Sequence, residues 1–401
     1  MELEDVLALD TQAGRAALAA AGAVPGDDPL AAASALRARG FEPRLAAAAL
    51  TQADLRRRAA AKFGPDAAGM LFTRAGLEQA TRGAVARRRA ARLAAAGVRR
   101  VADLGCGVGA DSIAFARAGL RVQAVDASPV TAAVAAANVR ALGLRDSVTV
   151  DTQDATETPL DAVDAVFCDP ARRTSGGRRV FDPRAYSPPW EFVTGLPGRV
   201  PHTVLKLAPG IDHALLPAGA EGEWVSVDGD VVEAAAWCGP LAGAPRRATV
   251  LRGSEAFELT GTGERQAPAG PLGAYLYDPD GAVVRAHLVA ELAEALDGAL
   301  LDPTIAYVTT NQRIETPFAR PYTILERLPI ALKKLRAALR ALDVGALQIL
   351  KRGSAHDVEE LRRQLRLDGS RTAVLALTRI GGAPAALLLT PADGPGAAAG
   401  R

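Results

Sequence analysis

The chain has 401 residues, of which 49% are hydrophobic and 23% are charged, with a formal net charge of +2. This composition excludes a disordered chain, and the length exceeds what one hydrophobic core usually organises, so we expect two or three domains. The acidic start, without a secretory signal, and the lack of an uncharged run long enough to span a bilayer predict a cytoplasmic protein.

Residues 1–95 are predicted to form a helical N-terminal module. The region is rich in Ala, Leu and Arg, and apolar residues recur at helical spacing in LAAASALRARG and LEQATRGAVARRRAARLAAAG. Gly97 then marks the end of the last helix before the apolar run VADLG.

Residues 96–255 alternate between predicted strands and helices. The strands are VADLG, RVQAVD, SVTVDTQD, AVDAVFCDP and HTVLKLAP, and helices lie in ADSIAFARAG and SPVTAAVAAANVRALG. Such alternation predicts a parallel sheet covered by helices. The segments GEWVSVDGD and VEAAAWCG predict a terminal antiparallel hairpin that turns at Asp228 and Gly229.

The remaining chain is predicted to hold two further α+β segments. A strand at ATVLRG and a Gly- and Pro-rich linker at GTGERQAPAGPLG lead into residues 272–320, with strand AYLYD, one helix VRAHLVAELAEALDG and strand TIAYVTT. Residues 322–390 follow, with strand ALQILKRG, helix HDVEELRRQLRL and strands TAVLALTRI and PAALLLT. Residues 391–401 are predicted to be a disordered tail.

The C-terminal region is basic. Residues 320–380 contain 13 Lys or Arg and 6 Asp or Glu, a net charge of +7. Such a surface attracts a polyanion, although the same charges also suit the solvated faces of helices.

A glycine-rich loop follows the first predicted strand. The sequence VADLGCGVGAD places Gly105, Gly107 and Gly109 between a strand and a helix. Glycine allows a tight turn there and lets a ligand approach bare backbone at the helix N-terminus. Asp103, two residues before the first glycine, is placed to meet the amino-acid end of such a ligand.

Acidic residues at the ends of the next two strands complete an adenosyl site. Asp126, followed by Ala127, ends the second strand, where a carboxylate accepts hydrogen bonds from both ribose hydroxyls. Asp154, followed by Ala155, comes after the third strand and is placed to receive the adenine amine. Together with the loop, these residues predict S-adenosylmethionine as cofactor.

Two other interpretations of the loop remain open. Gly105, Gly107 and Ala110 also satisfy the relaxed dinucleotide fingerprint, which would indicate a nicotinamide cofactor, and a degenerate loop would bind nothing. Asp103, Gly109 and the acidic-proline turn after the fourth strand favour the methyl donor.

The turn after the fourth strand, VFCDPARRTSGGRR, is the predicted catalytic segment. Open parallel sheets bind ligands at the carboxyl ends of their strands, so Asp169 and Pro170 should face the transferable methyl. Enzymes that methylate exocyclic amines carry an acidic or amide residue, two prolines and an aromatic ring here. Ala171 and Arg172 replace the second proline and the ring, which leaves the accepting atom open. Arg172 is placed to stack on a base or bind phosphate, and Arg173 extends the positive surface.

The lysine, histidine and cysteine residues give weaker indications of catalysis or metal binding. Lys206, in the fifth strand, points either into the cleft or along a packed helix. The histidines lack ligand-spaced partners, so no metal site is predicted, and Cys168 lacks a nearby histidine for covalent catalysis. The cysteines, without paired spacing, predict neither a disulfide framework nor a zinc site (Cys106, Cys168 and Cys238).

On these motifs the chain resembles a bacterial family of class I S-adenosylmethionine-dependent methyltransferases that end in a THUMP-like domain. The likeness includes FTRAGLEQATRGAVARRRAARLA, DLGCGVGADSIAFA, FCDPARRTSGGRRVFDP, LKLAPGID, YLYDPDGAVVRAHLVAEL and LQILKRGSAHDVEELRRQL. It implies an α/β fold with a Rossmann-like sheet, parallel with a terminal antiparallel hairpin, and a helical N-terminal module. A ferredoxin-like segment at 272–320 and a THUMP-like domain at 322–390 would form the α+β C-terminal region.

The resemblance also implies a partner. Related THUMP domains hold RNA for a modifying enzyme, so RNA, either tRNA or rRNA, is the expected substrate, with Lys351 and Arg352 contacting phosphate. Two other functions remain open: a methyltransferase for a small molecule or protein, whose C-terminal module serves oligomerisation, and a non-catalytic RNA-binding protein that retains a cofactor pocket.

Overall fold

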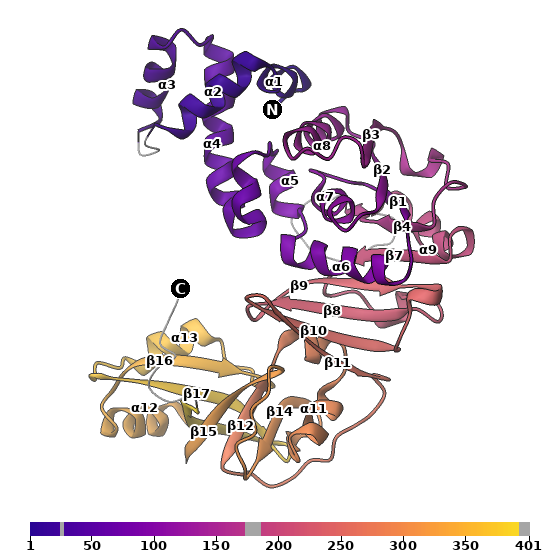
Figure 1. Cartoon of the computed structure of the whole chain (residues 1–401). Helices are drawn as coiled ribbons and strands as arrows, with labels where there is room; N and C mark the ends of the chain where they lie inside the picture. The colour runs from indigo at the N-terminus through magenta and orange to yellow at the C-terminus, as the bar shows by residue number, and fades with distance from the viewer. Residues whose placement is uncertain (25–27, 173–185, 393–401) are drawn as a thin grey trace. The chain divides into compact units, whose positions relative to one another are not determined.

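The computed structural model describes residues 1–24, 28–172 and 186–392, which divide into two compact units (Figure 1). The first unit comprises Met1–Glu221 and Ala235–Gly243, and the second comprises Gly222–Ala234 and Ala244–Arg401. The boundary therefore passes through a pair of strands, β8 (Glu221–Val227) and β9 (Asp230–Trp237). No helix in the described part of the chain is long and apolar enough to cross a membrane.

The N-terminal region of the first unit is helical, as predicted. Polar side chains begin two of its helices: Thr11 accepts a hydrogen bond from the Gly14 amide, and Thr73 accepts one from the Gly76 amide. The helices are α1 (Leu3–Leu9), α2 (Gln12–Gly22), α3 (Pro29–Ala38), α4 (Pro43–Phe63), the 3-10 turn η1 (Gly64–Ala68), α5 (Arg74–Gln79) and α6 (Gly83–Ala95).

A parallel sheet follows in the first unit, with strand order β7-β4-β1-β2-β3. The central strand β1 pairs on both sides, so that Asp103 lies opposite Ala124 of β2 and Phe167 of β4. The carboxyl ends of these strands therefore meet at one edge. The elements are β1 (Arg100–Leu104), α7 (Ala110–Arg117), β2 (Arg121–Asp126), α8 (Pro129–Ala141), β3 (Val148–Thr152), β4 (Ala165–Cys168), α9 (Trp190–Arg199) and β7 (His202–Leu207).

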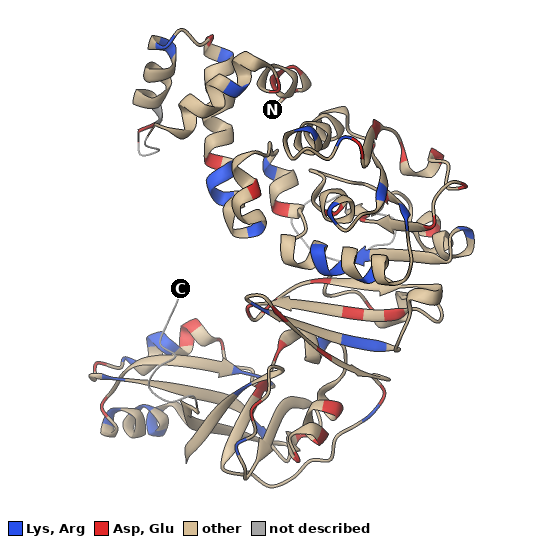
Figure 2. Cartoon of the chain, viewed as in Figure 1, with Lys and Arg blue, Asp and Glu red and all other residues tan. Residues whose placement is uncertain are grey.

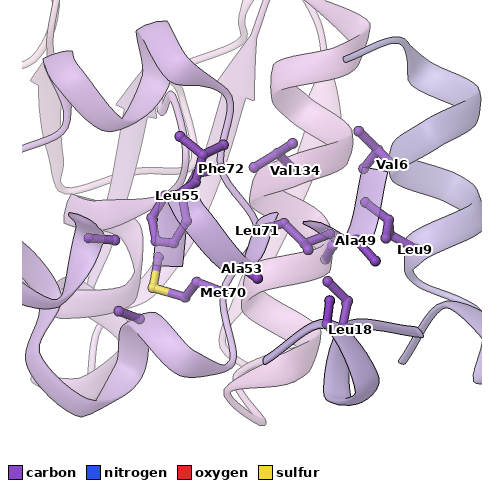
Figure 3. Packing of buried hydrophobic residues seen from close by; sticks show 14 of the residues in the cluster. Val6, Leu9, Leu18, Ala49, Ala53, Leu55, Met70, Leu71, Phe72 and Val134 are labelled. Carbon is purple, nitrogen blue, oxygen red and sulfur yellow. The ribbon is translucent and has the colours of Figure 1, made fainter. Parts of the chain in front are cut away.

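The N-terminal helices share a hydrophobic core with α8. Val6 of α1 and Leu18 of α2 belong to the same buried cluster as Phe72 and as Val134 of α8 (Figure 3). Because a buried apolar side chain contributes roughly 1.5–3 kcal/mol, this shared core joins the helices firmly to the sheet domain.

Residues 70–72 belong to no helix or strand, and two buried amide side chains hold them in place. Gln52 of α4 donates to the Phe72 carbonyl (2.7 Å) and accepts from the Phe72 amide (2.9 Å). Asn138 of α8 accepts from the Leu71 amide (2.6 Å) and donates to the carbonyls of Leu71 (3.0 Å) and Val108 (2.9 Å). These side chains supply the partners that a neighbouring strand would supply.

The second unit begins with an antiparallel hairpin, as predicted. Asp228 and Gly229 both have positive φ (52° and 91°), which suits a two-residue hairpin turn. Strand β10 pairs in parallel with β8 and antiparallel with β11. The strands are β8 (Glu221–Val227), β9 (Asp230–Trp237), β10 (Arg246–Arg252) and β11 (Glu255–Gly261).

A seven-stranded sheet with order β13-β14-β12-β15-β18-β17-β16 forms the rest of the second unit. Its two faces alternate along each strand: Leu375 and Leu377 pack with α12 and α13, whereas Val374 and Ala376 belong to the cluster on the opposite face. The elements are β12 (Tyr275–Pro279), α10 (Gly281–Arg285), α11 (Val289–Ala295), β13 (Ala299–Asp302), β14 (Ile305–Thr310), β15 (Ala319–Leu328), α12 (Leu332–Ala341), β16 (Val344–Lys351), α13 (Val358–Leu365), β17 (Arg371–Ile380) and β18 (Ala383–Pro391).

Three features of the second unit differ from the sequence prediction. The single helix expected over 284–298 is broken, because His287 adopts a left-handed conformation (φ 60°) that ends α10. Strand β15 spans the expected boundary at 320–322 and pairs with β12 and β18, so both C-terminal segments share one sheet. Strand β18 runs to Pro391, and residues 393–401 of the predicted tail lie outside the described residues.

We predict that Asn138→Ala destabilises the first unit by about 3 kcal/mol, because it leaves buried backbone groups of Leu71 and Val108 without partners. Urea unfolding measures this change. Gln12→Ala removes an exposed amide side chain and should cost less than about 0.5 kcal/mol. Equal losses in the two variants would contradict the assigned role of Asn138.

Candidate functional site

The glycine loop turns β1 into α7 at the carboxyl edge of the sheet. Gly105, Gly107 and Gly109 have φ values of 86°, 58° and 84°, a region that side chains other than glycine rarely adopt. The amides of Gly105 and Cys106 both donate to the Val125 carbonyl of β2 (3.0 and 2.9 Å). The predicted loop therefore forms with its backbone tied to the neighbouring strand.

Two glycines of the loop face different surroundings. A Cβ atom at Gly105 would lie 3.0 Å from the Asp169 carbonyl oxygen, whereas one at Gly107 would meet no atom within 4 Å. Gly105 thus allows the loop to lie against the turn after β4. Gly107 borders open space in which a ligand can approach the backbone.

Asp126 is half-buried beside the loop. Its Oδ2 accepts a hydrogen bond from the Gly107 amide (3.1 Å) and its Oδ1 accepts one from the Ser128 amide (2.9 Å). Burial raises the pKa of this carboxyl, and the two amide contacts act in the opposite direction. Ala127 is exposed next to it.

Asp154 is exposed at the end of β3. Its Oδ1 accepts hydrogen bonds from the Thr156 amide (2.8 Å) and hydroxyl (2.7 Å), which lower the pKa of the Asp154 carboxyl. The following Ala155 is buried. The geometry fixes the direction of the carboxylate, and its role as an adenine contact stays a prediction.

Asp103 lies beneath the loop and is completely buried. Its Oδ2 accepts a hydrogen bond from the Ser112 hydroxyl (2.5 Å), and its Oδ1 has no hydrogen-bond partner among the described residues. Burial, with the charges of Asp111 and Asp169, raises the pKa of Asp103 to about 8. The observed contact supports the start of α7, and a direct contact with a ligand stays a prediction.

A buried ion pair that the sequence analysis missed lies under the same edge. Arg89 of α6 pairs with Asp111 in the first turn of α7, and its guanidinium lies 4.5 Å from the ring centroid of Phe167 in β4. Both charged side chains are almost completely buried. Pairing offsets much of the desolvation cost of each charge. No local sequence pattern signalled this contact.

Asp169 and Lys206 form an ion pair at the carboxyl ends of β4 and β7. The Lys206 Nζ donates to Asp169 Oδ2 (2.7 Å) and to the Gln79 carbonyl (3.3 Å). The Asp169 side chain is 33% exposed and that of Lys206 13%, so the carboxylate is the more accessible partner. Of the two orientations left open for Lys206, the structure has the one that points into the site.

The remaining predicted residues of the catalytic turn are only partly described. Pro170 is buried, and the backbone of Arg172 lies in β5 (Ala171–Arg172), which pairs with β6 (Tyr186–Ser187). The side chain of Arg172 and all of Arg173 lie outside the described residues. Their predicted roles stay predictions.

Thiol and metal chemistry find no support at this edge. Burial raises the pKa of the Cys106 and Cys168 thiols well above the usual range, which disfavours a nucleophilic thiolate. Within residues 1–24, 28–172 and 186–392, no three His, Cys, Asp or Glu side chains gather as metal ligands.

The two basic residues predicted to contact phosphate differ in their surroundings. Lys351 is exposed, and its Nζ donates to the His356 carbonyl (3.0 Å). Arg352 pairs with Asp278 (2.8 Å), donates to the Pro279 carbonyl (3.1 Å) and lies 5.4 Å from the ring centroid of Tyr307. The guanidinium of Arg352 therefore links the end of β16 to β12, and Lys351 is the more exposed of the two side chains.

Three protein families match parts of the chain. Residues 101–174 match the methyltransferase domain, residues 319–391 match the THUMP domain-like family, and residues 2–59 match a domain of unknown function, DUF8688. The first match contains the glycine loop, and the second covers β15–β18.

Comparisons with individual proteins agree with these matches. Proteins from two strains of Mycobacterium tuberculosis, described as uncharacterized S-adenosylmethionine-dependent methyltransferases, are 40% identical over 266 residues, or 64% of this chain and 70% of theirs. A crystal structure from Porphyromonas gingivalis, provisionally described as a methyltransferase, covers 98% of this chain and 100% of its own, with a TM-score of 0.73 and 21% identity. That likeness shows a shared fold.

We predict that Asp103→Asn changes how stability depends on pH. The folded pKa of Asp103, about 8, exceeds the usual aspartate value, so between about pH 4 and pH 8 the folded state retains a proton that the unfolded chain has lost. Stability falls as pH rises through this window, and the asparagine variant escapes that loss. Its Tm should therefore gain on wild type between pH 5 and pH 8. A constant Tm difference would contradict the assignment.

Proposed function

The chain belongs to the family of S-adenosylmethionine-dependent methyltransferases, and we propose that it transfers the methyl group of this cofactor to RNA. The observation that carries the proposal is the Asp169–Lys206 pair, which lies against the glycine loop and leaves a carboxylate accessible beside it. The THUMP-like domain with its basic residues supports RNA as the substrate.

The residues at the strand ends fit the cofactor. Gly107 borders open space at the start of α7, and the half-buried Asp126 carboxylate has acceptor capacity left for ribose hydroxyls. Asp154 presents an exposed carboxylate for the adenine amine. When bound, the cofactor supplies an electrophilic methyl group on a sulfonium.

The contribution of the protein is alignment and proton acceptance. Lys206 occupies one oxygen of Asp169 and fixes the direction of the carboxylate. The other oxygen is available to accept a hydrogen bond from the methyl-accepting group, and then its proton. The absence of a side chain at Gly105 allows the backbone carbonyl of Asp169 to lie against the cofactor loop.

The proposed RNA surface lies on the THUMP-like domain. Lys333 and Lys334 at the start of α12 are exposed, as is Lys351, and Figure 2 shows basic residues on both α12 and α13. Arg336 and Arg340 instead donate to the carbonyls of Gln364 and Arg366 near the end of α13. The Lys351 Nζ also donates to a carbonyl, that of His356, but its side chain is exposed. The three lysines are the proposed phosphate contacts.

We predict that wild-type protein transfers labelled methyl from S-adenosylmethionine to total RNA from cells lacking this protein. Asp169→Asn and Asp169→Ala should lower kcat by about 100-fold, because both remove the carboxylate that accepts the proton. Cofactor affinity, measured by calorimetry, should change little. Asp161→Asn changes an exposed carboxylate in the same unit and should retain full activity.

Other outcomes separate the alternative functions. Cofactor binding with transfer to a small molecule or protein instead of RNA would overturn the RNA substrate. RNA binding without methyl transfer to any acceptor would indicate a binding protein that retains a cofactor pocket.

We also predict that the surface lysines govern the salt dependence of RNA affinity. The Lys333→Ser, Lys334→Ser, Lys351→Ser variant should bind RNA more weakly, with a slope of log affinity against log salt that is shallower by about 0.7–0.9 for each phosphate that the variant no longer neutralises. Glu359→Gln, a change of an exposed acidic residue on α13, is the control and should not make the slope shallower. An unchanged slope in the lysine variant would place the RNA elsewhere.

A further inference from the structure

The carboxyl end of the short helix α5 is held by a lysine from α4. The Lys62 Nζ donates to the carbonyls of Leu77 (2.6 Å), Glu78 (2.8 Å) and Ala80 (3.2 Å). The last carbonyls of a helix lack partners within the helix, so an ammonium group with three donors satisfies several of them at once.

The remaining carbonyl of this turn belongs to Gln79 and contacts the catalytic site directly. It accepts a hydrogen bond from Lys206 (3.3 Å), the same ammonium group that pairs with Asp169 (2.7 Å). Four successive carbonyls, 77 to 80, are thus shared between two lysines from distant parts of the sequence. One lysine comes from the N-terminal helices and the other from the sheet.

The two ammonium groups are held in place against their mutual repulsion. Burial lowers the pKa of Lys62, and the positive charge of Lys206 lowers it further. The carbonyls of α5, at the negative end of the helix dipole, offset this repulsion.

A lysine at position 62 suits the geometry of the α5 carbonyls. Lysine is otherwise rare in this chain. Of the 47 basic residues only five are lysines: Lys62, Lys206, Lys333, Lys334 and Lys351. A compact ammonium group donates to several converging carbonyls, whereas the planar fork of arginine matches a carboxylate or phosphate.

Other side chains of α4 hold the segment that precedes α5. Gln52 holds Phe72, and Arg56 donates to the Met70 carbonyl (2.7 Å), so α4 fixes the chain that leads into α5 as well as the carboxyl end of α5. Arg58 also faces α5, but its pair with Glu78 is long (3.9 Å) and exposed. Arg58 is therefore a matched control on the same helix.

We propose that α4 is a positioning element of the active site: Lys62 fixes the carboxyl end of α5, and the Gln79 carbonyl of that end orients Lys206 toward Asp169. The inference rests on the proposed function, in which Asp169 contacts the methyl-accepting group. Lys62 touches neither acceptor nor cofactor in this scheme and acts through Lys206.

The orientation of Lys206 can be measured without any substrate. Protein labelled with ¹³C at lysine Cε gives five side-chain signals, and Lys62→Met and Lys206→Met assign the two that matter. We expect Lys62→Met to move the Lys206 signal toward those of the exposed lysines, as Asp169→Asn should also do. Arg58→Met should leave it in place. A Lys206 signal that is unchanged in folded Lys62→Met protein would overturn the inference.

The kinetic consequence is a loss of kcat at constant cofactor affinity. Lys62→Met should lower kcat about tenfold, with less than a twofold change in the Kd for S-adenosylmethionine, because misplacement of a catalytic group slows the chemical step. Lys62→Arg should restore only part of the rate, because its planar fork does not match three converging carbonyls. Arg58→Met should keep the wild-type rate.

The two measurements distinguish failure of the inference from failure of the proposed function. If wild-type protein methylates no RNA, the proposed function fails, and the Lys206 signal still decides whether Lys62 orients this side chain. If RNA is methylated and Lys62→Met retains full kcat, the positioning role is wrong. A lower Tm with an unmoved Lys206 signal would reduce Lys62 to a structural residue and also overturn the proposal.

Discussion

The amide of Asn138 is the contact on which the arrangement of the first unit depends. From a completely buried position on α8, it bonds to the backbone of Leu71 and to the carbonyl of Val108. One side chain therefore connects the N-terminal region, the glycine loop and a helix of the sheet domain. Because each broken contact would leave a buried backbone group unsatisfied, these three parts are expected to move together.

The candidate site follows from that connection. The N-terminal helices bring the carboxyl end of α5 to Lys206, and the turn after β4 brings Asp169 to the same ammonium group. Gly105 allows this turn to lie against the cofactor loop. The methyltransferase fold supplies the edge at which the cofactor loop lies, whereas Lys206, the partner of Asp169, also contacts the N-terminal helices through the Gln79 carbonyl.

Local patterns in the sequence were sufficient for the parallel sheet, the glycine loop and the Asp228–Gly229 hairpin, because turn residues and strand ends carry their own signals. Local patterns do not predict features that depend on contacts between residues far apart in the sequence. Helical spacing continues through His287, yet the chain turns there. The sequence predicts a phosphate contact for Arg352 but gives no signal of its ion pair with Asp278, 74 residues earlier. The role of Lys62 likewise depends on carbonyls that carry no sequence signal.

Strand β15 has a consequence for how this protein can be divided. The THUMP-like match begins at residue 319, at the first residue of β15, but residues 319–323 of that strand pair with β12, which lies outside the match. The segment that matches the THUMP-like family, residues 319–391, is therefore smaller than the segment that forms the complete sheet. A fragment cut at the family boundary would expose an unpaired strand edge prone to self-association, so transplanting this domain requires residues from β12 onward.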